Sequence, residues 1–369
     1  MATRRRKLVP TIIILLLAGS VWWYANRVPS VSERATLHVP TSEVISLAFS
    51  RDGKTIATGA SDGTVMRWDT TTGRAGATFK QARQVCPPTF SPDGRLLATG
   101  VLAAEGRNGE VLLWDRAGRQ VHAELKVKGV PRCIQFSPDG RSLTVGSADD
   151  RSVRLTTWDV EGWRERPGTR VPFDYISGAS AIALTPDGRA FAACGSVGTI
   201  RVWDSSTGVE RFRGMAHDDS VYSLVFSPDG RLLAESTNRP SDGENIYEPG
   251  TVRLWDTATG SLRATFQGYF RNLAFSSDGR HLAATGVDLH TAWLKSLPDS
   301  VRYMLKDSLG LYGTSSHGVT IWDVRTSRPK ASVGGRDRRI VEEVFSPDGR
   351  TLATSDGVSV TLWDLGGLR

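Results

Sequence analysis

The pattern Gly59-Ala60-Ser61-Asp62-Gly63 is the clearest candidate for chemistry, because it matches the G-x-S-x-G motif of serine hydrolases. In those enzymes the serine occupies a sharp turn between a strand and a helix. Short apolar runs flank the pattern on both sides, and Ser-Asp-Gly-Thr is typical of a turn between two strands. The sequence therefore predicts a hairpin at this position and no catalytic role for Ser61.

The remaining residues that could bind metals are not spaced as metal ligands. The histidines and cysteines are scattered singly, at His38, His122, His217, His281, His290 and His317, and at Cys86, Cys133 and Cys194. The segment Asp242-Gly243-Glu244-Asn245 is acidic enough to suggest calcium, but it lacks a complete loop of oxygen ligands. We therefore predict a protein without a metal, a cofactor or an enzymatic activity.

A tryptophan that ends a short strand pattern recurs with a period of roughly 40 residues, which indicates a repeat architecture. Seven of these tryptophans precede an aspartate: Trp68, Trp114, Trp158, Trp203, Trp255, Trp322 and Trp363. An eighth, Trp293, precedes a leucine. A second motif, Phe-Ser-Pro-Asp-Gly-Arg, starts at Phe90, Phe136, Phe226 and Phe345, with looser copies from Phe49, Leu184 and Phe275.

Each unit reads as strand, Asp-Gly turn, strand, turn, and a third strand ending in tryptophan, followed by a fourth strand. This pattern, which runs from residue 34 to the end of the chain, resembles the WD-repeat family of β-propellers. The resemblance implies an all-β fold in which four-stranded blades surround a central channel. It also implies that residues 35–39 supply the outer strand of the last blade, so that the two ends of the propeller are joined.

The number of blades depends on Trp293. Residues 301–323 align with residues 44–69, which favours eight blades, one of them without a proper outer strand. Only 12 residues separate Trp293 from Leu305, however, which is too few for a full set of strands. We therefore predict eight blades, with seven blades and an insertion at 287–308 as the alternative.

Residues 1–33 differ in character from the repeats. Arg4-Arg5-Arg6-Lys7 precedes an uncharged segment, residues 8–25, that contains Trp22, Trp23 and Tyr24 near its end. This arrangement is typical of a transmembrane helix with its basic side in the cytoplasm. We predict a basic cytoplasmic tail (1–7), a transmembrane signal anchor (8–25), a linker (26–33) and the propeller (34–369) on the opposite side of the membrane. A signal peptide cleaved before Val21 is the alternative.

The net charge of +7 does not indicate a nucleic-acid-binding protein. Five basic residues and one acidic residue lie within residues 1–33, which leaves a net charge of +3 on the repeats. This remaining charge is spread over turns that also contain aspartates, unlike the clustered basic surface that nucleic acid requires.

The loops whose length departs from the repeat are the best indication of function, because blades are scaffold and loops carry binding residues. Three segments between second and third strands are long: 101–109, 148–152 and 236–250. The predicted interaction surface comprises Arg239, Asp242, Glu244, Asn245, Tyr247, Glu248, Phe173 and Tyr175.

The repeat tryptophans are predicted to be structural rather than functional. The resemblance also implies a buried network in which His217 would join Ser236 and Trp255, although the aspartate of that network is missing. The predicted function is a non-catalytic protein-interaction scaffold tethered to a membrane. The alternatives are a propeller enzyme or ligand-binding protein with a site at the channel mouth, and a secreted soluble propeller.

Overall fold

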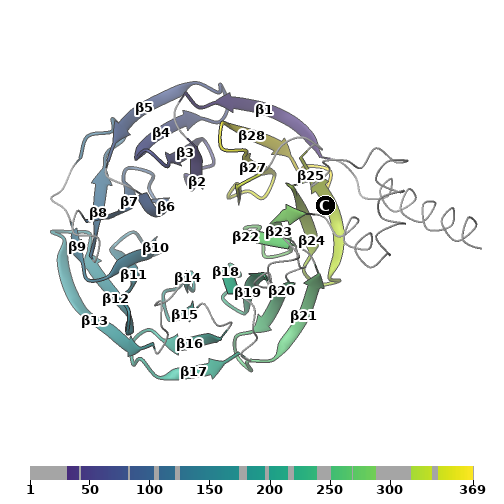
Figure 1. The fold of residues 1–369 in the computed structure, drawn as a ribbon. Helices are drawn as coiled ribbons and strands as arrows, with labels where there is room; N and C mark the ends of the chain where they lie inside the picture. Colours follow the sequence, from purple (N-terminus) through teal and green to yellow (C-terminus); the bar gives the residue numbers. More distant parts are fainter. Residues whose placement is uncertain are drawn as a thin grey trace, which may run out of the picture.

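The computed structural model describes residues 31–40, 43–81, 84–103, 108–120, 125–173, 181–195, 199–214, 220–238, 251–267, 269–287, 317–334 and 340–368. These residues form strands joined by turns, and the strands assemble into seven four-stranded antiparallel sheets arranged in a ring (Figure 1). The first strand of every sheet contacts the first strands of both neighbouring sheets, so these inner strands surround the central channel.

The blades follow the chain in order. Blades one to three are β2 (Val44–Phe49), β3 (Thr55–Ala60), β4 (Thr64–Asp69) and β5 (Ala75–Lys80); β6 (Gln84–Phe90), β7 (Leu97–Leu102), β8 (Gly109–Trp114) and β9 (Leu125–Val127); and β10 (Val130–Phe136), β11 (Ser142–Ala148), β12 (Ser152–Asp159) and β13 (Arg164–Pro172). Blades four and five are β14 (Ala181–Leu184), β15 (Ala190–Cys194), β16 (Ile200–Asp204) and β17 (Glu210–Arg213); and β18 (Ser220–Phe226), β19 (Leu232–Asn238), β20 (Thr251–Asp256) and β21 (Leu262–Gln267). Blades six and seven are β22 (Tyr269–Phe275), β23 (His281–Val287), β24 (His317–Asp323) and β25 (Arg328–Val333); and β26 (Glu342–Phe345), β27 (Thr351–Ser355), β28 (Ser359–Asp364) and β1 (Ser32–His38).

The preference for eight blades is wrong. The second strand of blade six, β23, pairs directly with β24, so that Leu282 lies opposite Trp322. Trp322 is therefore the third-strand tryptophan of this blade, and residues 288–316 separate its second strand from its third. The alternative of seven blades with an insertion agrees with this register, although the insertion is longer than predicted. Trp293 itself lies outside the described residues.

The Asp-Gly turns form for the reason that the sequence suggests. In blade two the Ser91 hydroxyl donates to Asp93 Oδ1 at 2.6 Å and accepts from the Leu96 amide at 2.9 Å, while Asp93 Oδ1 accepts from the Arg95 amide. Gly94 has φ near +68°, a conformation that residues with a Cβ rarely adopt. The same hydrogen bonds recur in the turn that follows each inner strand, so one local motif sets the hairpin in every blade.

The seven repeat tryptophans that the structure describes pack in the core clusters between blades. Trp114 of blade two stacks on Phe79 of blade one with ring centroids 4.1 Å apart. In three blades the indole N–H also donates to a buried second-strand threonine, in the pairs Trp68–Thr58, Trp114–Thr99 and Trp363–Thr354. In these three blades, apolar packing of the tryptophan is thus combined with a hydrogen bond from its indole N–H.

The expected network in blade five does not form among the described residues. Trp255 Nε1 has no hydrogen-bond partner, and the Ser236 hydroxyl donates instead to the carbonyl of Arg271 in blade six. His217 lies outside the described residues.

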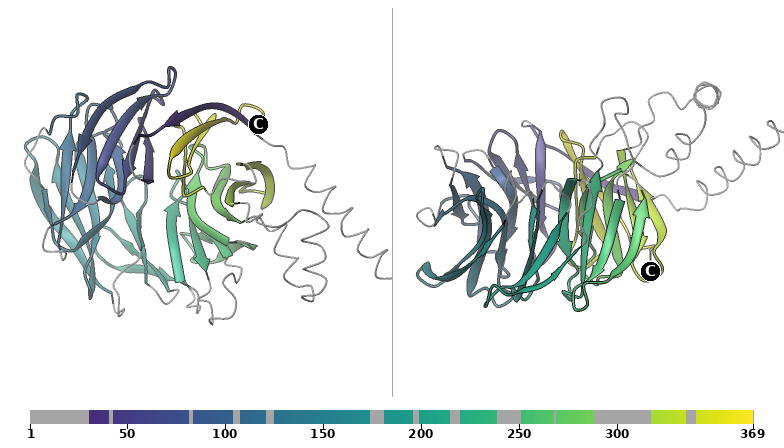
Figure 2. Two further views of the ribbon diagram at one scale, coloured as in Figure 1. Left: turned by 45° about the horizontal axis from the view of Figure 1, so that its top comes forward. Right: turned by 60° about the horizontal axis from the view of Figure 1, so that its bottom comes forward.

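The two ends of the propeller are joined in blade seven. β1 pairs with β28, and Leu37 and Val39 enter the same core cluster as Val360 and Leu362. Two further views show β1 lying along the outside of this blade (Figure 2). The predicted outer strand at residues 35–39 is therefore confirmed, with β1 starting three residues earlier. Ring closure places residues more than 300 positions apart in the sequence in one sheet.

The predicted transmembrane helix, residues 8–25, lies outside the described residues, as do the tail at 1–7 and most of the linker at 26–33. Within the ranges that the structure describes, no helix is long and apolar enough to cross a membrane.

Candidate functional site

The strand register shows which loops share a face of the ring. Ser220, at the start of inner strand β18, lies opposite Asn238, the last residue before the long segment 239–250. Tyr269 lies opposite Val287, which precedes the segment 288–316. The loops between second and third strands therefore emerge where the inner strands begin. We call this the long-loop face, and we call the opposite side, which carries the Asp-Gly turns, the turn face.

Buried threonines hold the base of the longest predicted loop. The Thr237 and Thr251 hydroxyls are 2.9 Å apart, and the Thr251 amide also donates to Thr237 Oγ1. The predicted surface residues beyond this base, which are Arg239, Asp242, Glu244, Asn245, Tyr247 and Glu248, lie outside the described residues, as does Tyr175.

Phe173 does not belong to an exposed surface. Its side chain is fully buried, with its ring 6.1 Å from that of Trp203 and tilted against it. Its position after the outer strand β13 suggested a surface loop, but the chain turns inward at this point and Phe173 fills the space between blades three and four. It is a core residue.

The segment 148–152 forms a tight turn rather than an extended loop. Asp149 accepts hydrogen bonds from the Arg151 amide and from the Ser152 hydroxyl, at 2.9 and 2.8 Å. Arg170 on β13 donates to the same Ser152 hydroxyl at 3.1 Å. The polar side chains of this turn are therefore hydrogen-bonded to other groups of the protein.

The rim of the channel on the long-loop face carries side chains that the loop argument overlooked. Four residues before the phenylalanine that ends the inner strand stand Ile45, Arg132, Tyr222 and Arg271 in blades one, three, five and six. Tyr222 is 51% exposed and Ile45 is 38% exposed, which is unusual for large apolar side chains in inner strands. We refer to these four residues as the channel rim. Aligning the inner strands of the repeats would have found them.

Beside the rim, blade seven places two glutamates in its inner strand. Asn272 of blade six donates to Glu342 Oε2 at 2.7 Å, and burial raises the pKa of Glu342 to about 8. Glu343 is only 3% exposed, and neither of its carboxyl oxygens has a hydrogen-bond partner. Burial and then the neighbouring Glu342 raise the pKa of Glu343 well above its usual range. The Thr285 amide opposes this shift, but its geometry does not meet that of a hydrogen bond to either carboxyl oxygen. Both groups are therefore biased towards the protonated, neutral form.

Glu343 departs from the repeat at a position that is otherwise apolar. The residue two places before the end of the inner strand is apolar and buried in the other six blades: Leu47, Pro88, Ile134, Ile182, Leu224 and Leu273. A carboxyl group in this place weakens the packing of blade seven against blade six, because a buried polar group without a partner destabilises the fold. Such departures from packing rules concentrate at functional sites.

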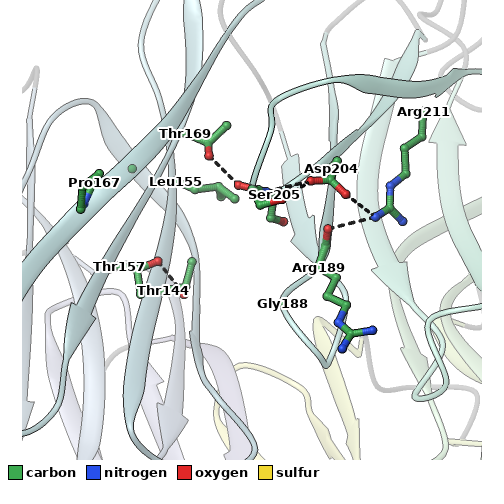
Figure 3. Close-up of a pocket in the computed structure, with 12 residues that line it drawn as sticks. Thr144, Leu155, Thr157, Pro167, Thr169, Gly188, Arg189, Asp204, Ser205 and Arg211 are labelled. Atoms are coloured by element: carbon green, nitrogen blue, oxygen red, sulfur yellow. Dashed lines mark hydrogen bonds and ion pairs between the residues drawn. The ribbon is translucent and has the colours of Figure 1, made fainter.

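On the turn face, a pocket of about 460 Å³ lies between blades three and four (Figure 3). Its polar groups mostly satisfy one another: the Thr169 hydroxyl donates to the Ser205 carbonyl, and Arg211 pairs with Asp204 at 2.7 Å. The Ser205 hydroxyl is the exception, with no partner. This pocket is therefore better explained as part of the interface between the two blades than as a binding site.

The described residues show no arrangement that performs catalysis. Ser61 lies between β3 and β4, so the predicted hairpin is confirmed and the geometry of a hydrolase elbow is absent at this position. No group of three or more histidine, cysteine or acidic residues gathers to hold a metal within the described ranges. The three cysteines are free thiols, and burial raises the pKa of Cys133 to about 12, which disfavours a reactive thiolate.

Seven four-stranded sheets that close through the N-terminal strand define a β-propeller of the repeat type. The family profile "WD domain, G-beta repeat" matches residues 32–69, 79–115, 122–159 and 210–256. Nuclear distribution protein PAC1 of Coccidioides posadasii is 32% identical over 204 residues, which cover 50% of this chain and 38% of that protein. PAC1 of Arthroderma benhamiae is 26% identical over 268 residues, covering 59% of this chain and 55% of the relative.

WD repeat-containing protein 1 of Gallus gallus is 25% identical over 250 residues, covering 64% of this chain and 37% of that protein. The chain thus spans between 37% and 55% of the length of these three relatives. Together with the seven sheets, the matches support a seven-bladed WD-repeat propeller.

Proposed function

We propose that this chain is a non-catalytic scaffold whose propeller presents the long-loop face to a protein partner. The observation that carries the proposal is the channel rim, where the exposed Tyr222 and Ile45 stand on the same ring as Arg132 and Arg271. Aromatic side chains and arginines are enriched at the centres of protein interfaces, where they supply most of the binding energy.

Among the described residues, three exposed large apolar side chains (Ile45, Tyr222 and Val358) lie on the long-loop face and two (Val209 and Leu262) on the turn face. Val358, in the turn between β27 and β28, is 71% exposed and also lies on the long-loop face. The arginines of the rim supply the polar component, since neither Arg132 nor Arg271 forms an ion pair with a described residue. The rim therefore offers apolar anchors together with arginines that form no ion pair among the described residues.

We further propose that residues 8–25 anchor the chain in a membrane, with the N-terminus in the cytoplasm and the propeller on the opposite side. The support is the uncharged segment that follows a basic cluster and ends in an aromatic group. N-terminal sequencing of the mature protein tests this: an intact residue 1 supports the anchor, whereas a chain that begins at Val21 replaces it with a secreted propeller.

The interaction face is tested by crosslinking of the full-length chain in its host cells, followed by mass spectrometry. Tyr222→Ala removes a rim anchor, and Leu262→Ala is the matched control, because Leu262 is 49% exposed at the start of β21 on the turn face. We expect partner recovery to fall roughly tenfold for Tyr222→Ala, as for truncation of an interface anchor, and to stay unchanged for Leu262→Ala. Equal recovery from both variants would place the interface elsewhere.

A further inference from the structure

A second pocket, of about 770 Å³, opens on the turn face between blades six and seven. Its volume is within the usual range for ligand sites. Ile321, Phe345 and Leu365 form an apolar floor that belongs to the core cluster between the two blades. Two Asp-Gly turns, one from each blade, form part of its rim.

The basic side chains of this pocket lack the partners that equivalent residues have elsewhere. In blades three, four and five an arginine on the outer strand pairs with the aspartate of the Trp-Asp motif, in the pairs Arg166–Asp159, Arg211–Asp204 and Arg263–Asp256. Blade six has Lys330 in the corresponding place, next to the bulge at which Ile321 and Trp322 pair with Ala331 and Pro329.

Lys330 makes no ion pair with Asp323 or with any other described residue, unlike its counterparts. Asp323 Oδ1 accepts from the Thr326 amide and hydroxyl instead, at 2.7 and 2.8 Å. Arg350 and Arg325, which also line the pocket, are likewise without an ion pair among the described residues. Among the described residues, three cations at this site thus lack an ion pair, although Arg325 and Lys330 still lower the pKa of Asp323, and Arg350 that of Asp348, through their charge.

The carboxylates of the pocket are occupied by the turns that they close. Asp278 accepts from the Ser276 hydroxyl and the Arg280 amide at 2.6 and 3.0 Å. Asp348 accepts in the same way from Ser346 and Arg350. One oxygen of each of these carboxylates is fixed in its turn. The pocket lining carries four cationic side chains against three carboxylates, a balance that favours an anionic ligand.

His281 supplies a buried polar atom without a partner. Its Nε2 is inaccessible to solvent and makes no hydrogen bond. The pKa of His281 is lowered, first by burial and then by the charge of Lys330, with a smaller contribution from Arg280. The charges of Asp278 and Asp323 oppose this lowering. Buried polar atoms in folded proteins are normally hydrogen-bonded, so His281 is an unsatisfied titratable group in the pocket wall, where it would sense a charge placed in the pocket.

We propose that this pocket binds a peptide segment of a protein partner in which a carboxylate side chain stands beside apolar side chains. The apolar floor would take the apolar side chains, and Lys330 and Arg350 would hold the carboxylate near His281. The site lies on the face opposite the channel rim and does not depend on the function proposed for that rim.

Fluorescence anisotropy with a labelled peptide, Phe-Glu-Leu-Glu-Phe, tests the proposal on the full-length chain. The matched peptide Phe-Gln-Leu-Gln-Phe keeps the shape and removes the charge. Lys330→Met is the test variant, and Arg231→Gln is the control, because Arg231 occupies the same turn position in blade five as Arg350 does in blade seven. We expect binding of the Glu peptide to weaken roughly tenfold or more in Lys330→Met and to remain within twofold in Arg231→Gln, since a charge-assisted contact is lost only in the former.

The pKa of His281, measured by NMR from its imidazole resonance, provides a second readout. A purely structural effect of Lys330 would not change how this pKa responds to the peptide. The Glu peptide should raise the pKa of His281, and the Gln peptide should leave it unaltered. Equal affinity for both peptides, equal affinity of wild type and Lys330→Met, or no binding of the Glu peptide would each overturn the proposal.

Discussion

Replacing Glu343 with leucine should make the propeller more stable. The carboxyl group is buried without a hydrogen bond, at a position where the six other blades carry buried apolar side chains. Leucine has a similar volume, so the substitution introduces little overpacking. The substitution removes an unsatisfied buried polar group, which costs about 1–3 kcal/mol of folding stability. It also adds buried apolar surface, which contributes about 1.5–3 kcal/mol.

The expected gain in the free energy of unfolding is therefore about 3 kcal/mol after allowance for imperfect packing. Chemical denaturation at pH 7 measures it as a higher midpoint at an unchanged slope. Glu343→Gln is the control, because it keeps a polar side chain of nearly the same shape and should give much less of the gain. A loss of stability in Glu343→Leu would refute the reasoning, since it would mean that the carboxyl group makes an interaction in the folded protein.

The dependence of stability on pH tests the same residue independently. An acid whose pKa is raised in the folded state stabilises the fold fully below its unfolded pKa, and this contribution is lost as pH rises through the folded pKa. For Glu342 that window extends from its ordinary value of 4.5 to about 8, and Glu343 titrates in the same direction. Wild type should therefore lose stability between about pH 5 and pH 8. Glu343→Leu should lose less stability over this range. If stability depended on pH identically in both proteins, Glu343 would not contribute to the loss.

Two further substitutions test the packing between blades. Thr99→Val should lower the free energy of unfolding by about 2 kcal/mol, measured by denaturation, because Thr99 accepts from Trp114 Nε1 and donates to Gln81 inside the protein. Gly100→Ala should cost about 2–3 kcal/mol, because a Cβ at this position would overlap Cys86 Sγ. Adding Cys86→Ala should restore part of that loss, and strict additivity in the double-mutant cycle would contradict the clash.

The repeated parts of the fold were predictable because they rest on local chemistry. Ser91, Asp93 and Gly94 close their hairpin through bonds among neighbours, so the turn can be read from a few residues. Ring closure was predictable through the resemblance to the WD-repeat family, which implies that residues 35–39, ahead of the first inner strand, supply the outer strand of the last blade. The face shared by the second-to-third-strand loops follows from the same strand order.

The number of blades could not be settled by local pattern. Trp293 resembles a blade tryptophan in sequence, but membership of a blade depends on which strands pair across 29 intervening residues, and β23 pairs with β24. Phe173 was misplaced for a related reason. Its neighbours indicate a surface loop, whereas its burial depends on the contact with Trp203 in the next blade. Both errors concern contacts between segments that are distant in the sequence, on which local patterns carry no information.

The residues of greatest functional interest are those that break the repeat. A side chain that recurs in every blade is sufficiently explained by packing, because each blade must bury the same face against its neighbour. Tyr222, Glu343 and Lys330 have no such explanation. Tyr222 exposes an aromatic ring in an inner strand, Glu343 places a carboxyl group in the core, and Lys330 lacks the ion pair that its counterparts form. Each of these side chains lowers stability or solubility without improving the packing of its blade. A role in binding would account for its presence.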